Sequence, residues 1–149
     1  MSYSPFFFNQ NSRGSSRATQ AGFQNGSGST LAMGVPVSVN TSSQILALDV
    51  TNEASVQAIV GLTGVSIPSA ATGSVVDNGR LENITTSFAI GDAVYAGKAN
   101  PLTNIKPDIG DADGFASGDF VIFIGVVVKN EFNPSLKDLK LMISVVGQL

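Results

Sequence analysis

The stretch Phe120-Val-Ile-Phe-Ile-Gly-Val-Val-Val128 decides the fold, because it is apolar on both of its alternating faces. On a β-strand, successive side chains point to opposite sides, so Phe120 and Ile122 lie on one face and Val121 and Phe123 on the other. Neither face could then stay in water. The length of the run and its β-branched and aromatic content favour a strand over a buried helix. We therefore expect a central strand of a sandwich or barrel, or a strand covered by a second subunit.

The run that follows supplies a partner for this strand. Residues 137–146 are apolar at alternate positions, including Leu139 and Leu141, and they end almost at the last residue. Asn133-Pro134 lies between the two runs and is a turn signal. This order predicts a long hairpin that builds the end of the chain into a sheet.

From Leu31 onward, the chain has the pattern of short strands separated by turn residues. Asn78-Gly79 is the strongest local hairpin signal, and Thr51 or Asn52 could cap a single helical turn. Gly61 and Gly64 indicate bulges or bends in a long apolar strand. No helix of ten or more residues is indicated. We predict an all-β fold, a single antiparallel barrel or sandwich domain over residues 31–149, with an extended N-terminal arm over residues 1–30.

The amino-acid composition excludes several classes of partner and of catalytic site. The chain has 149 residues, 43% of them hydrophobic, which suits one domain with a real core. Only 13% are charged and the net charge is −3, so we expect neither nucleic acid nor an anionic membrane as a partner. Cysteine and histidine are absent, which excludes a Ser-His-Asp triad, a Cys-His pair and an imidazole metal site. We expect no enzymatic activity and no cofactor. The first residues do not resemble a secretory signal, and no run is long enough to span a membrane.

The first 30 residues differ from the rest, since they are rich in Ser, Asn, Gln, Gly and Arg and hold no acidic residue. Such a segment cannot bury enough surface to fold alone. Three interpretations are open: an arm that docks on a partner, a plain tail, or a part of the domain core. Its aromatic residues favour an arm that docks on a partner, with arginines forming hydrogen bonds around them. The candidate partner-binding residues are Phe6, Phe7, Phe8, Arg13, Arg17 and Phe23.

The apolar strand and the low charge together favour a protein whose surface is covered by other subunits, although the neutral surface of a monomer stays open. The face that carries Val121, Phe123 and Val127 is the candidate oligomer interface. The acidic loop Asp108–Asp119 offers a weak calcium pattern, and a solvated turn explains it better. A carboxylate-based glycosidase is disfavoured, because the chain has no Trp and only two Tyr to line a sugar cleft.

Four segments, in this order, resemble the small all-β decoration or cement proteins of tailed-bacteriophage capsids. They are Gly34–Val39, Ile59–Thr63, Gly91–Tyr95 with Leu102-Thr103, and Ile124–Val127 before a closing apolar strand. The resemblance implies a barrel-like domain that oligomerises, often as a trimer, and lies over junctions between subunits of the major capsid protein. The Gly-Asp-x-Val-Tyr turn also occurs in tail and fibre proteins of phages.

The function that we expect is therefore a non-enzymatic capsid decoration protein. Its partners would be the major capsid protein and further copies of itself, in a homotrimer. It would be made in the host cytoplasm and act on the capsid surface of the virion. The alternatives are an adaptor in the phage tail, neck or fibre and, in another class, a glycan-binding module that helps the phage to attach.

Overall fold

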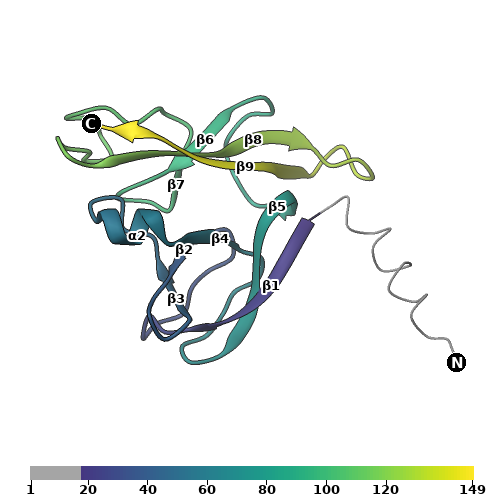
Figure 1. The fold of residues 1–149 in the computed structure, drawn as a ribbon. Helices are drawn as coiled ribbons and strands as arrows, with labels where there is room; N and C mark the ends of the chain where they lie inside the picture. Colours follow the sequence, from purple (N-terminus) through teal and green to yellow (C-terminus); the bar gives the residue numbers. More distant parts are fainter. Residues whose placement is uncertain (1–17) are drawn as a thin grey trace, which may run out of the picture.

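A computed structural model describes the chain from Ala18 to Leu149, with side chains described from Ala21 onward (Figure 1). Within this range the protein is almost entirely β-structure. The elements, in chain order, are β1 (Ala18–Asn25), β2 (Pro36–Val39), β3 (Gln44–Ala47), α2 (Glu53–Gln57), β4 (Ile59–Thr63), β5 (Thr72–Ile84), β6 (Ala93–Ala96), β7 (Leu102–Thr103), β8 (Phe120–Lys129) and β9 (Lys137–Gln148).

Five strands close into a barrel. Their order is β1, β3, β2, β4 and β5, and β5 returns to pair with β1. These pairs are antiparallel except for a short parallel contact in which Gln24 and Asn25 of β1 meet Gln44 and Ile45 of β3. The predicted all-β barrel is confirmed, with this one parallel pair as a departure from the expected pattern.

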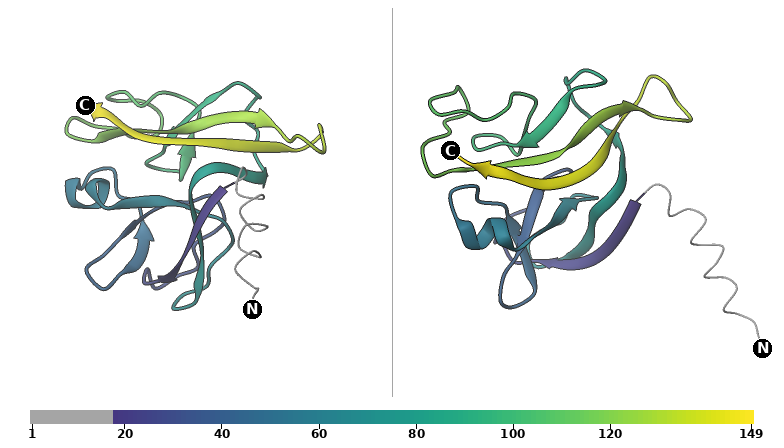
Figure 2. Two further views of the ribbon diagram at one scale, coloured as in Figure 1. Left: turned by 45° about the vertical axis from the view of Figure 1, so that its right-hand side comes forward. Right: turned by 45° about the horizontal axis from the view of Figure 1, so that its top comes forward.

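The remaining strands form a second layer over the barrel. β9, β8, β6 and β7 continue in this order from the far half of β5, as Figures 1 and 2 show. The main core contains side chains from both layers, among them Leu62 and Val76 of the barrel and Ile122, Ile124 and Leu139 of the second layer. A smaller apolar cluster is formed by barrel residues: Leu31, Val37, Ile45, Ile67 and Val75.

β8 is a central strand, as its sequence predicts. It pairs with β9 along its whole length, from Lys129 opposite Lys137 to Phe120 opposite Gln148, and with β6 on its other edge. The predicted hairpin is thus confirmed. However, Val121 and Val127 are only 4% and 0% exposed within this single chain. Neither side chain offers surface to a second subunit, because the chain's own layers already cover the strand.

β5 corrects the prediction of a hairpin at Asn78-Gly79. The strand continues through both residues, and Gly79 has a φ of +82°. At this position β5 changes its partner from β4 to β9, and its ladder with β1 skips Asp77. A glycine in the left-handed region and a bulge bend a strand at a barrel corner as well as they make a hairpin turn. The dipeptide therefore marks the corner that joins the two layers.

Two smaller predictions hold. Asn52 caps the five-residue helix α2, since its side chain accepts hydrogen bonds from the N–H groups of Ala54 and Ser55. Gly61 lies next to a register shift between β2 and β4. A Cβ at Gly61 would collide with the backbone of Val76, so only glycine permits this close approach. Within residues 18–149, no helix combines the length and apolar character needed to cross a membrane.

The predicted arm boundary near residue 30 differs from the structure, because β1 already pairs with β5 from Ala18 onward. Phe23, one of the candidate docking residues, is half-buried and packs against the barrel cluster around Val75. Its side chain contributes to the protein's own core, because strand pairing places it above that cluster. The other candidate docking residues, Phe6, Phe7, Phe8, Arg13 and Arg17, lie outside the described residues.

Candidate interaction surfaces

The C-terminal half of β9 has a free edge. β9 pairs with β5 only from Lys137 to Leu141, because β5 bends away at Gly79. From Met142 to Gln148, none of the other described strands pairs with the edge opposite β8. The segment contains neither a charged residue nor a proline, which are the residues that usually protect an edge from pairing. Its backbone can therefore bind another chain.

The same segment carries apolar side chains into solvent. Two register shifts against β8 place extra residues in β9, and such bulges twist a strand. Ile143 still packs against the main core, whereas the side chains on either side of it do not. Met142, Val145 and Val146 are 49%, 51% and 53% exposed. We name these three residues the β9 strip. Neighbouring exposed apolar residues on one free edge are typical of a protein-binding surface.

The tip of the β8–β9 hairpin presents a second apolar surface. Figure 2 shows the tip projecting from the end of the layer opposite the C-terminus. Phe132 lies there and is 82% exposed. The Asn130 side-chain oxygen accepts hydrogen bonds from the N–H groups of Phe132 and Asn133, each at 2.9 Å. Asn133 in turn accepts hydrogen bonds from the backbone and hydroxyl of Ser135. These hydrogen bonds fix the backbone of the tip, from which the Phe132 side chain projects into solvent.

Buried polar groups anchor this tip to the sheet. Asp138 is only 1% exposed, and its carboxylate accepts hydrogen bonds from the Asn130 side chain and the Asn83 N–H, both at 3.1 Å. Arg80 lies 3.4 Å from the same carboxylate and also contacts Glu131 at 3.3 Å. These bonds connect β5, β9 and the tip. A backbone that is already ordered reduces the entropy cost of binding, which suits the tip as a docking element that carries Phe132.

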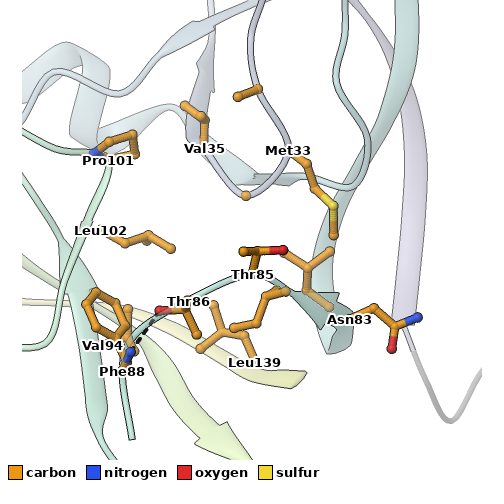
Figure 3. Close-up of a pocket in the computed structure, with 14 residues that line it drawn as sticks. Met33, Val35, Asn83, Thr85, Thr86, Phe88, Val94, Pro101, Leu102 and Leu139 are labelled. Carbon is orange, nitrogen blue, oxygen red and sulfur yellow. Dashed lines mark hydrogen bonds between the residues drawn. The ribbon is translucent and has the colours of Figure 1, made fainter. Parts of the chain in front are cut away.

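A pocket of about 370 Å³ lies where β5 ends between the two layers. In Figure 3, Met33 and Val35 lie on one side of it, and Leu102, Thr86 and Leu139 lie across from them. None of the described residues that line it carries a charge. The Thr86 hydroxyl already accepts a hydrogen bond from the Phe88 N–H at 3.1 Å, the dashed line in Figure 3. The pocket can therefore take an apolar group.

The acidic loop that could have bound calcium is held by bonds within the protein. Asp113 accepts hydrogen bonds from the N–H groups of Lys98 and Ala99. Asp119 accepts a 2.7 Å hydrogen bond from the Lys98 ammonium, which lowers the pKa of Asp119 below its usual value although burial opposes the shift. Among residues 18–149, no three acidic side chains gather closely enough to hold a metal ion. The loop's carboxylates fix the backbone between β7 and β8.

The sequence analysis placed the candidate oligomer interface on β8, whereas the candidate surfaces described above lie on β9, at the hairpin tip and at the pocket. Of the candidate interface residues, Phe123 remains half-buried and contacts Tyr95 edge to face, with ring centroids 5.6 Å apart. The signal for Phe132 was present, since it is an aromatic residue inside a predicted connection. The sequence held no local pattern for the pocket, because the lining residues come from five separate parts of the chain.

Neither a scan against protein-family models nor a search of curated proteins finds a match for this chain. The function must therefore be inferred from the pattern of the sequence and from the surfaces described above.

Proposed function

We propose that the protein is a non-enzymatic structural component of a tailed-phage virion, a decoration protein that stabilises the head by binding across subunits of the major capsid protein. The observation that carries this proposal is that two surfaces occur on one molecule. One is the free, uncharged edge of β9, and the other is the hydrogen-bonded hairpin tip that exposes Phe132. Both surfaces are apolar and preformed, and neither is used by the protein's own fold. The pattern resemblance to decoration proteins supports the same assignment.

The physical mechanism is attachment at several weak contacts. A strand edge binds an extended segment through backbone hydrogen bonds, and an aromatic anchor adds apolar burial. In this proposal, copies associate with one another, as a trimer, and each copy adds its contacts to the shell. Linked contacts raise the total affinity because the second and third bind at high effective concentration. Such a protein closes gaps between capsid subunits without changing any bond.

Purified virions test the location. Quantitative mass spectrometry should find hundreds of copies per particle, because only the shell offers so many equivalent positions. A few copies per particle would instead support an adaptor in the tail, neck or fibre. The glycan-binding alternative needs an exposed aromatic platform; the Tyr95 ring is already engaged with Phe123, and Phe132 offers one ring at the hairpin tip. Saturable binding on a glycan array would nevertheless replace the decoration assignment.

Reattachment to capsids that lack the protein tests the surfaces. Val145→Ser and Phe132→Ser should each weaken binding about tenfold, since a buried apolar anchor contributes on the order of 1–2 kcal/mol to an interface. Val65→Ser is a matched control, because Val65 is 46% exposed but lies outside the β9 strip and the tip. Equal binding by all three variants would remove these surfaces from the proposal.

A further inference from the structure

We infer that the pocket in Figure 3 receives phenylalanine side chains from residues 6–8 of a second copy of this chain. The inference deepens the proposed function, because it names the partner of the N-terminal segment and the site where this segment binds. It assigns contact between copies to the segment and the pocket, and leaves the β9 strip and Phe132 to the shell.

The pocket has the size and chemistry for aromatic side chains. An apolar cavity of about 150 Å³ can hold benzene, so about 370 Å³ offers room for two phenyl rings. Aliphatic side chains such as Leu102 and Leu139 line it together with the ring of Phe88. Polar atoms of Thr85, Thr86 and Asn83 can form hydrogen bonds with the backbone of a segment that binds in the pocket. The pocket is thus apolar within and has hydrogen-bonding groups beside it.

The sequence of residues 1–17 is complementary to this site. Three consecutive aromatic residues, Phe6 to Phe8, are followed by a segment, residues 9–17, that has no apolar side chain at all. Both charged residues of this segment are arginines, whereas residues 18–149 hold six basic and eleven acidic residues. Opposite charges therefore attract the segment to the domain of any copy.

The length of the segment is sufficient for it to reach a second copy. Ala18 pairs with Gly79, only two positions before Leu81, which lines the pocket, so about 7 Å of β5 separates the segment's exit from its own site. Phe8 lies ten residues before Ala18 and can extend about 33–36 Å from it. A domain of this size has a radius of gyration of about 14 Å and therefore a diameter of about 36 Å. A reach of this length equals the width of one subunit, so Phe6 to Phe8 can reach the pocket of a copy that packs beside the domain.

Cross-linking of the full-length protein tests the inference. A photoreactive p-benzoylphenylalanine replaces Phe7, and unlabelled and ¹⁵N-labelled chains are refolded together. Irradiation should link position 7 to peptides that contain Met33 or Leu102, in pairs that combine both isotope labels. Links confined to chains of one label would place the segment on its own domain and overturn the inference. Links to other surfaces, or no links at all, would overturn it as well.

Pocket variants give an independent readout by light scattering. Met33 lies at the pocket and is 40% exposed, so Met33→Trp should fill the pocket while the fold is kept, and self-association should weaken about tenfold to a hundredfold. Ile109→Trp is the control, since Ile109 is 58% exposed and lies away from the pocket. Unchanged melting of both variants verifies folding. Self-association that survives Met33→Trp but is lost in Phe132→Ser would assign the contact to the hairpin tip instead and overturn the inference.

No capsid is present in either experiment. Failure would therefore remove the exchange of segments between copies, while the location in the virion is decided separately by the copy number. Conversely, a tail or fibre location would leave the cross-links intact.

Discussion

Asp138 provides the sharpest test of how the hairpin tip is held. Its carboxylate is buried and accepts hydrogen bonds from the Asn83 N–H and the Asn130 side chain, with Arg80 at 3.4 Å. Asp138→Ala removes all three contacts at once. Arg80 still donates a hydrogen bond to the Lys129 carbonyl at 3.1 Å and is partly exposed to water. The loss of its contact with Asp138 should therefore add little to the loss of stability. The Asn130 amide, which is buried, loses its buried partner.

The expected loss follows from these contacts. A buried donor left without its partner costs about 1–3 kcal/mol, and a hydrogen bond to a charged group contributes about 1.5–3 kcal/mol. Asn83 is exposed and can turn to water, and Asn130 keeps a 3.2 Å bond to the Asn83 side chain, so the lower values apply. We expect Asp138→Ala to lower the free energy of unfolding by about 2–4 kcal/mol. Asp138→Asn keeps an oxygen for Asn83 and Asn130 and should cost about half as much.

Urea unfolding measures these losses, and Glu131→Ala is the matched control. Glu131 contacts the same Arg80 at 3.3 Å, but its side chain is 65% exposed, so this pair should contribute less than about 1 kcal/mol. The reasoning would be refuted if Asp138→Ala cost no more than Glu131→Ala. It would also be refuted if Asp138→Asn lowered the free energy of unfolding as much as Asp138→Ala, since the retained oxygen would then contribute nothing to stability.

Three further predictions concern the hairpin, the acidic loop and the tip. A Cβ at Gly125 would collide with the Lys140 carbonyl across the β8–β9 ladder, so Gly125→Ala should cost about 2–3 kcal/mol in urea unfolding, whereas Gly147→Ala, with open space around it, should cost under about 1 kcal/mol. Lys98 lowers the pKa of Asp119, so their contact stabilises the fold above about pH 4 and is lost as the pH falls through the lowered pKa. The stability difference between wild type and Lys98→Gln should therefore be larger at pH 7 than at pH 3, and a constant difference would contradict it. Phe132→Ser should leave the melting temperature unchanged within about 2 °C, because the side chain packs on nothing that stabilises the fold, and a marked drop would show that Phe132 supports the core.

Local sequence patterns predicted which segments form strands, but they did not predict which strands pair with one another. The two-faced run of β8 and the alternation of β9 are properties of neighbouring residues, so the hairpin could be derived from the sequence. Asn78-Gly79 was misread, because a bulge at a barrel corner and a hairpin turn demand the same backbone freedom. Only the partners of β5 distinguish them, and these come from distant parts of the chain.

The same limit applies to the candidate oligomer interface on β8. An apolar side chain on a strand has to be covered, but the sequence does not say whether its own chain or another subunit covers it. Val121 and Val127 are covered by their own chain, whereas the described residues leave 51% of Val145 and 53% of Val146 exposed. The difference arises because β5 leaves β9 at Leu141, an event that depends on the bend at Gly79.

The distribution of apolar surface also has a consequence for assembly. The β9 strip, Phe132 and the pocket are separate apolar sites, on β9, at the hairpin tip and at the end of β5. In the proposed virion, symmetry repeats every site, so contacts that are individually weak act together. Binding through several small sites would thus hold the protein on the shell through many copies, each of which contributes only weak contacts.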